Sequence, residues 1–304
     1  MNPESRGVRV EPVNQGHVAD VIDFLRNNFV PQFTPQRLRG LFEYRWSEPI
    51  KKPNLGYMLV TRHQIVGFLG AIYAERLLGS RIVKTCNMST WYVRPEFRWA
   101  SMKLLYALMS QKEYAIVNLS ASPEVRRVME ALRFETIDLS KHVYLPWHFP
   151  AKFFMRSPEI LSNPQQIADL LQGEELRVFR DHISYQLSHY FVRHGDQHSY
   201  LVLKRRSFPG EVAFGWLPFK KPKLMWYPSM EVLFLSNPMV AAAQWPGLVA
   251  AILRRERVLG VVAAERLFSG NARAGSRLDH RNYLLSRTPL GATIDSLYSE
   301  FVVM

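Results

Sequence analysis

The stretch that decides the fold is Trp91-Tyr92-Val93-Arg94-Pro95-Glu96-Phe97-Arg98-Trp99-Ala100-Ser101-Met102-Lys103-Leu104-Leu105. Its first residues complete an apolar run over about 83–93 that is typical of a strand, and Pro95 ends that run. Apolar side chains then recur at helical spacing over 98–111, at Met102, Leu105, Tyr106 and Met109. The stretch therefore predicts a strand, a short turn and a helix in direct succession.

The residues on both sides of this stretch predict a mixed sheet flanked by helices. Strands are expected at 8–13, 57–61, 65–73, 83–93, 114–119 and within 134–145. Helices are expected at 18–25, 34–46, 98–111 and 123–132. The order β-α-α-β-β-β-α-β-α-β over the first 146 residues indicates an α/β layer architecture rather than a helix bundle or a β-sandwich.

The length of 304 residues fits two domains. Four prolines, at 146, 150, 158 and 164, mark 147–173 as a linker. The order of elements then partly repeats, so we expect 174–304 to be a degenerate copy of 1–146. The copy carries an insertion at 207–229 that is rich in proline, lysine and aromatic residues.

The composition indicates an acidic partner. Lys and Arg number 39 against 26 Asp and Glu, which gives a net charge of +13. The single cysteine, Cys86, excludes a disulfide framework and a cysteine-rich zinc site. The sequence shows neither an apolar signal region nor a run of the roughly 18 apolar residues that span a bilayer. We therefore expect a cytoplasmic protein, with peripheral contact at the inner membrane face as an additional expectation.

Two segments resemble the Gcn5-related N-acetyltransferase (GNAT) superfamily. The stretch 91–105 is similar to the family's V-x-P-x-[YF]-R strand and turn into a helix, and 122–134, SPEVRRVMEALRF, is similar to the helix that the family ends with Leu-Gly-Phe. The resemblance covers 7–146 by motif and the remainder by element order. It implies an acyl-CoA N-acyltransferase-like fold with two tandem GNAT-like domains, of which 1–146 is catalytic and the second is degenerate.

The resemblance also implies acyl-CoA as co-substrate, with no prosthetic group. A turn that exposes backbone N–H groups at a helix N-terminus binds a pyrophosphate. The family pattern R-x-x-G-x-[GA] has Ser101 and Lys103 in place of its glycines here. The residues implied for coenzyme A are Trp91, Val93, Arg98, Trp99, Ala100, Ser101, Met102, Lys103 and Ser122.

Catalytic groups are less defined by the sequence. Met129 stands where family members often have the tyrosine that protonates the leaving thiolate. The candidates that would hold or deprotonate the acceptor are Cys86, Asn87, Ser89 and Glu43, and deprotonation through water fits equally well. Cys86 also fits a buried apolar position. Glu300 is expected on a last strand, either facing solvent or meeting an acceptor amine at a domain junction.

Several alternatives remain open at this stage. The acceptor is an amine or a hydroxyl of a small molecule, a sugar or a lipid. An aminoacyl-tRNA-dependent transferase of the FemABX type, which would bind RNA, and a non-catalytic GNAT-fold binding protein are the other functions considered. The aromatic and basic stretches 145–156 and 214–227 suit packing within the protein, an anionic membrane surface, an acyl-chain entrance or RNA. The spacing of the histidines between 182 and 198 argues against a metal site.

Overall fold

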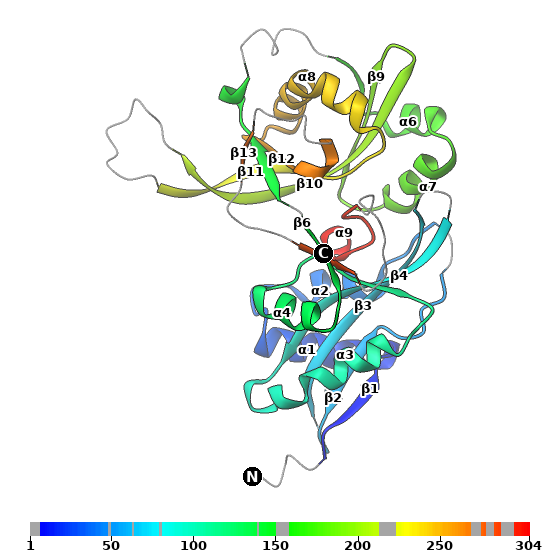
Figure 1. Cartoon of the computed structure of the whole chain (residues 1–304), viewed down its shortest axis with the longest axis vertical. Helices are drawn as coiled ribbons and strands as arrows, with labels where there is room; N and C mark the ends of the chain where they lie inside the picture. The colour runs from blue at the N-terminus through cyan, green and yellow to red at the C-terminus, as the bar shows by residue number, and fades with distance from the viewer. Residues whose placement is uncertain are drawn as a thin grey trace. The chain divides into compact units, whose positions relative to one another are not determined.

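The structure is a computed structural model. It describes residues 7–47, 50–62, 64–78, 81–138, 140–149, 158–212, 223–268, 275–277, 283–286 and 295–304. The chain forms two compact units: unit 1 comprises 1–137 and 283–304, and unit 2 comprises 138–282. Each unit is built on a mixed sheet flanked by helices, as the sequence predicts (Figure 1).

The sheet of unit 1 has the order β1-β2-β3-β4-β5-β14-β6. Its strands are β1 (Arg9–Pro12), β2 (Gly56–Val60), β3 (Ile65–Leu78), β4 (Arg81–Val93), β5 (Ala115–Asn118), β6 (Glu135–Asp138) and β14 (Tyr283–Ser286). Neighbouring strands from β1 to β4 are antiparallel, whereas β4 and β5 are parallel. The parallel pair requires a crossover connection, which the helix between β4 and β5 supplies.

Helices cover both faces of this sheet (Figure 1). They are α1 (Val18–Asn28), α2 (Pro35–Glu43), α3 (Ser101–Met109), α4 (Pro123–Ala131) and α9 (Glu300–Val303). On one face, α3 and α4 bury Leu104, Leu105 and Met129 against Cys86 and Met88 of β4. On the other face, the ring of Phe42 on α2 lies 5.8 Å from that of Phe68 on β3.

The helix starts follow from local sequence. Thr34 caps α2 by accepting the N–H of Arg37, and Ser122 caps α4 by accepting the N–H of Val125. A proline occupies the first turn of each helix, where its missing N–H costs nothing. Both helices begin within one residue of the starts expected at 34 and 123.

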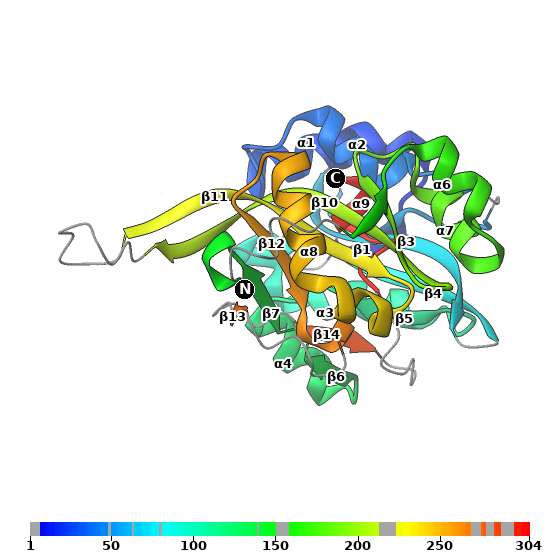
Figure 2. The ribbon, with the colours of Figure 1, turned by 90° about the horizontal axis from the view of Figure 1, so that it is seen from above.

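The sheet of unit 2 has the order β13-β7-β12-β11-β10-β9-β8. Its strands are β7 (Lys141–Tyr144), β8 (Glu159–Leu161), β9 (Ser188–His194), β10 (Gln197–Val212), β11 (Lys223–Leu235), β12 (Gly260–Ala264) and β13 (Ser276–Arg277). Its helices are α6 (Pro164–Leu170), α7 (Gly173–His182) and α8 (Pro238–Glu256). Figure 2 shows α8 lying over the sheet, where it buries Trp245, Leu248 and Ile252.

The sheets of the two units have the same strand order, but in each unit the strand at the sixth position does not follow the fifth in sequence. We call this arrangement a strand exchange. Reading unit 2 from β8, its order β8-β9-β10-β11-β12-β7-β13 matches that of unit 1 position by position. The sixth position of unit 2 is filled by β7, which directly follows β6 of unit 1 in sequence, and that of unit 1 by β14, which follows β13 of unit 2. The chain therefore crosses between the units twice.

This exchange explains where the expected boundaries differ from the structure. The expected domains, 1–146 and 174–304, place β7 in the first and β14 in the second, whereas β7 pairs with β12 and β14 with β5. Within the expected linker 147–173, β8 pairs with β9 and α6 buries Ile167, so this segment belongs to unit 2. Residues 150–157 lie outside the described residues.

Two further expectations need comment. Glu300 begins helix α9 instead of lying on a strand, because Ser299 caps the helix by accepting the N–H of Phe301. The insertion expected at 207–229 is the distal part of the β10–β11 hairpin. Residues 213–222 of that insertion lie outside the described residues, so its expected membrane contact stays a prediction.

The strand exchange predicts that residues 1–146 do not fold alone. Without β14, the edge of β5 at Val117 and Asn118 loses its partner, and an unpaired edge favours aggregation. A chain that joins 1–137 to 283–304 through a Gly/Ser linker keeps that partner and serves as the matched control. We expect cooperative urea unfolding, followed by circular dichroism, for the joined chain only. A monomeric, cooperatively unfolding 1–146 would contradict the prediction.

Candidate functional site

Strands β4 and β5 separate at one end of the unit 1 sheet. Their parallel register runs from Thr85 opposite Ala115 to Asn87 opposite Val117. Strand β4 continues to Val93, whereas β5 ends at Asn118. The side chain of Asn118 accepts the N–H of Ser120 at 3.0 Å, which turns the chain away toward the cap of α4. The two strands therefore leave an opening at their carboxyl ends.

A cavity of about 320 Å³ lies at this opening. Its walls come from β4, from the segment between β5 and α4, from the segment between α1 and α2, and from the C-terminal helix α9. The described residues that line it are Phe29, Val30, Phe33, Leu38, Met88, Ser89, Thr90, Trp91, Asn118, Ser120, Ala121, Ser122, Val125, Glu300 and Met304. Among them Glu300 carries the only ionisable side chain, and the neutral polar side chains of Ser89, Thr90, Asn118, Ser120 and Ser122 lie among the apolar ones.

Strand β4 carries a β-bulge beside this cavity. Phe68 of β3 pairs with Tyr92, and Gly70 pairs with Ser89, so Thr90 and Trp91 together face the single residue Leu69. Thr90 adopts the left-handed backbone region with φ of 51°, which is unusual for a β-branched residue. A bulge leaves one residue out of the ladder, and strain of this kind concentrates at functional sites.

Polar side chains of β4 lie on the face toward α1 and α2. Asn87 and Ser89 are 2% and 3% exposed, and they follow the two-residue period of the strand. Oδ1 of Asn87 and Oγ of Ser89 have no hydrogen-bond partner among the described residues. Nδ2 of Asn87 donates to Oε2 of Glu300 at 2.5 Å. Buried polar atoms without partners are uncommon, which favours a ligand-binding role for this group.

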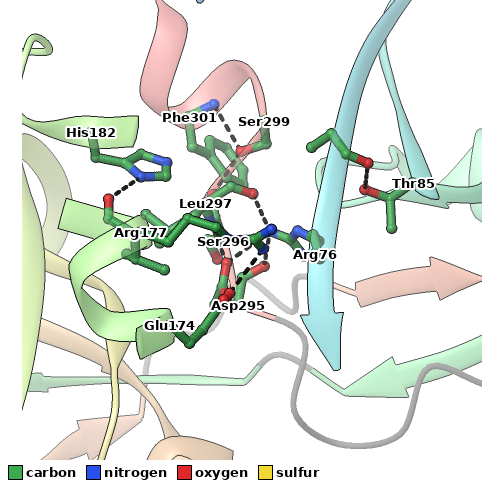
Figure 3. A network of polar contacts seen from close by, with 12 residues as sticks. Arg76, Thr85, Glu174, Arg177, His182, Asp295, Ser296, Leu297, Ser299 and Phe301 are labelled. Atoms are coloured by element: carbon green, nitrogen blue, oxygen red, sulfur yellow. Dashed lines mark hydrogen bonds and ion pairs between the residues drawn. The ribbon is translucent and has the colours of Figure 1, made fainter. Parts of the chain in front are cut away.

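The segment that carries Glu300 is anchored to β3 by a buried arginine (Figure 3). Nη2 of Arg76 donates to Oδ1 of Asp295 at 2.7 Å and to the carbonyl of Leu297. The same Asp295 oxygen accepts the N–H of Leu297. The guanidinium also lies over the ring of Tyr298, 5.0 Å from its centroid. Arg76 is 4% exposed, so these contacts are largely shielded from water.

Helix α9 packs closely on α2. A Cβ on Gly40 of α2 would lie 1.9 Å from the carbonyl oxygen of Val303, so only glycine permits this approach. Trp46, which follows α2, packs its ring edge to face with Tyr298 at 4.9 Å. The C-terminal segment is thus fixed at two places, on β3 and on α2, with Glu300 between them in sequence.

The residues expected to bind coenzyme A occupy two different environments. Trp91 and Ser122 line the cavity. Arg98, Trp99 and Lys103 are exposed at the start of α3, where Nζ of Lys103 lies 5.4 Å from the centroid of the Trp99 ring. Val93 and Ala100 are buried in the core, and Ser101 and Met102 are half-buried.

The turn before α3 differs from the expected one. Residues Pro95–Ala100 form a 3-10 helix that continues directly into α3, and the N–H of Ser101 donates to the carbonyl of Arg98. An open turn with a free Ser101 N–H is therefore not formed. The absence of glycine at positions 101 and 103 agrees with this helical path. Arg98 and Lys103 are the two exposed cations at this turn and at the start of α3.

The expected catalytic residues are only partly brought together. Ser89 lines the cavity, and Asn87 reaches it through Glu300. Cys86 is fully buried in the core below α3, and burial raises the pKa of its thiol well above the usual value. Glu43 is exposed at the end of α2 and is not among the described lining residues. The structure thus does not bring Cys86 or Glu43 to the cavity.

Sequence reasoning missed the walls that come from distant segments. Phe29, Val30 and Phe33 precede α2, and nothing in their pattern indicates a cavity. The capping residue Ser299 before Glu300 is a helix-start signal that could have corrected the expected last strand.

Comparison with known proteins supports the fold. No family model matches the chain, and no curated protein matches its sequence. Among solved structures, a GCN5-related N-acetyltransferase from Anabaena variabilis matches with a TM-score of 0.54 at 13% identity, over 91% of this chain and 72% of that one. The chain has the GNAT fold.

Two other solved structures agree with this assignment. A GCN5-related N-acetyltransferase from Kribbella flavida matches with a TM-score of 0.53 at 11% identity, over 94% of this chain and 72% of that one. The N-myristoyltransferase of Saccharomyces cerevisiae with bound myristoyl-CoA matches with a TM-score of 0.51 at 10% identity, over 94% and 79%. These matches cover more than 90% of this chain, so the similarity in fold includes both units.

Unit 2 has a different chemistry at the matching position of its own sheet. Glu231 holds the same place in the β11–β12 register as Asn87 does in β4–β5. Its carboxylate is 2.5 Å from Nζ of Lys141 and 2.8 Å from Nε of Arg206. Burial alone would raise the pKa of Glu231, but the two cations outweigh it and lower that pKa. This position is a closed ion cluster rather than an open site.

The described residues show neither a cluster of potential metal ligands nor a helix with the length and apolar character needed to cross a bilayer.

The anchoring role of Arg76 is testable by substitution. Arg76→Met leaves Asp295 without its buried cation, and breaking a buried ion pair typically costs about 3–5 kcal/mol. Arg9→Met breaks the exposed pair with Glu11 and should cost less than about 1 kcal/mol. Urea denaturation measures both unfolding free energies. Equal losses for the two variants would show that Arg76 is not a structural anchor.

Proposed function

We propose that this protein is an acyl-CoA-dependent acyltransferase whose reaction takes place in the unit 1 cavity. The observation that carries the proposal is the separation of β4 and β5 beside the bulge at Thr90. An opening between two strands admits an extended chain such as pantetheine, and the residue left out of the ladder offers its backbone groups to it. The fold of acyltransferases such as those compared above supports this interpretation.

The chemistry of the cavity walls fits a thioester. Apolar side chains at Met88, Trp91 and Val125 exclude water from the acyl group and the sulfur. A backbone N–H at the bulge polarises the thioester carbonyl and stabilises the oxyanion that forms on attack. Positioning the acceptor beside the carbonyl then converts a bimolecular step into an effectively unimolecular one.

The nucleotide end of coenzyme A would meet the start of α3. Arg98 and Lys103 present two exposed cations there, and Trp99 is 56% exposed beside Lys103. Charge-assisted hydrogen bonds from these side chains to the phosphates replace those that a glycine turn would donate. The tryptophan ring offers a face on which the adenine base can stack.

The experiment that tests the function is binding of acetyl-CoA and of a longer acyl-CoA by isothermal titration calorimetry, together with native mass measurement of the purified protein. We expect micromolar binding of at least one thioester. The double variant Arg98→Glu, Lys103→Glu should weaken it by at least about tenfold, because each lost contact with phosphate is worth about 1.5–3 kcal/mol.

The matched control is the double variant Lys51→Glu, Lys112→Glu, which makes the same change in net charge at exposed positions of unit 1. Its affinity should stay close to that of the wild type. If neither thioester binds, the proposed function is wrong. If both double variants lose affinity equally, the phosphates are held by the overall charge rather than by the start of α3.

A further inference from the structure

We propose that unit 2 carries a second ligand site, which binds a free α-amino acid with an apolar side chain. The site is a cavity of about 650 Å³ formed by described residues of unit 2. Arg255 binds the carboxylate of the ligand, and Glu256 binds its ammonium group. This site is separate from the acyl transfer proposed for unit 1 and does not depend on it.

The walls of the cavity come from several segments of unit 2. They are the segment between β8 and α6, the segment between α7 and β9, the start of β9 and the last turn of α8. Pro164, Ile183 and Leu187 provide apolar side chains, and Ile183 is exposed. An apolar ligand side chain that covers these groups is removed from water, which favours binding.

Two neighbouring residues of α8 bring opposite charges to this cavity. Successive side chains of a helix point about 100° apart, so neighbours reach different surroundings. Arg255 donates from Nη1 to Oγ of Ser162, whereas Oε1 of Glu256 accepts the O–H of Tyr190 at 2.6 Å. The two charged groups are therefore held by hydroxyl groups of different segments and are not paired with each other.

Both charged groups keep hydrogen-bonding capacity for a ligand. The guanidinium of Arg255 has further N–H donors besides the one that Ser162 accepts. Oε2 of Glu256 lies 3.8 Å from Nη2 of Arg205, which is too far for a hydrogen bond. Glu256 is also the last residue of α8, where the helix dipole attracts a cation. An α-amino acid carries a carboxylate and an ammonium group on one carbon atom and so complements both residues.

His189 provides an independent observation that favours a ligand with a carboxylate. It lines the cavity, is 6% exposed, and its Nε2 has no hydrogen-bond partner among the described residues. Nδ1 lies 2.6 Å from the hydroxyl of Tyr200, which has no other acceptor in the described part of the chain, so the hydroxyl donates and Nε2 carries the proton. Burial lowers the pKa of His189 to about 4, so its ring is neutral near pH 7. Buried donors without partners are uncommon, and a carboxylate supplies the missing acceptor.

The test compares L-leucine with 4-methylpentanoate, which lacks the ammonium group, and with 3-methylbutylamine, which lacks the carboxylate. Each compound is titrated against the full chain at pH 7 without acyl-CoA and followed by ligand-observed NMR. We expect L-leucine to bind at least about tenfold more tightly than either analogue, a difference of about 1.4 kcal/mol. The reason is that each analogue leaves one charged group of the cavity without its counterpart.

Two variants separate the roles of the charged residues. Arg255→Gln should bring L-leucine and 3-methylbutylamine within about twofold of each other and keep the preference over 4-methylpentanoate, because only the contact with the carboxylate is lost. Glu256→Gln, which keeps an acceptor for the O–H of Tyr190, should show the converse. The matched controls are Arg193→Gln and Glu159→Gln, an exposed pair of unit 2 outside the lining residues, and both should leave the three affinities unchanged.

The inference is overturned if the wild type does not bind L-leucine, or binds it no more tightly than the two analogues. It is also overturned if Arg193→Gln weakens binding as much as Arg255→Gln, since net charge rather than the cavity would then hold the ligand. Failure of acyl-CoA binding would concern the proposed function alone, because these titrations contain no thioester.

Discussion

The contact on which the site depends is the one between Arg76 and the segment 295–298. A guanidinium buried on β3 binds the carboxylate of Asp295 and the carbonyl of Leu297, and it covers the ring of Tyr298. Removing a charge of this kind from water is costly, so the guanidinium needs these partners to remain buried. That requirement fixes the backbone just before α9, and α9 in turn places Glu300 against Asn87. One wall of the cavity thus depends on an ion pair that does not line it.

The exchange of strands gives this dependence its topological basis. The sixth strand of unit 1, β14, follows all of unit 2 in sequence, and the sixth strand of unit 2, β7, precedes the other strands of that unit. Strand β14 also brings the C-terminal segment into unit 1. A cavity on residues 1–137 is therefore completed by residues near 300. In unit 2, the matching sheet position holds Glu231 between Lys141 and Arg206, and Lys141 comes from the exchanged strand β7. The same topology thus yields a cavity lined by the Glu300 side chain in unit 1 and a buried carboxylate paired with two cations in unit 2.

Much of the fold could be predicted from local pattern. The caps Thr34 and Ser122, the proline that follows each, and the alternating strands of β2 to β4 fix element type through interactions between near neighbours. The domain boundaries could not be predicted in the same way, since the pairing of β7 with β12 and of β14 with β5 is a long-range choice between several exposed strand edges. Within the candidate site, the sequence indicates Asn87 and Ser89 because they lie on the strand that leads into the GNAT-like motif. Cys86 lies on the same strand, yet the two-residue period directs it to the opposite face.

The sequence alone determined that this chain is a tandem α/β protein with a strand-turn-helix motif resembling that of GNAT acyltransferases, because motif and periodicity are properties of neighbouring residues. Only the tertiary structure decided that the turn before α3 is a closed 3-10 helix, that β4 and β5 separate beside Thr90, and that Glu300 is the carboxylate at the opening. Glu300 is 213 residues away from Asn87 in sequence. Their contact arises from strand exchange and a buried ion pair, and neither feature can be recognised from the local sequence.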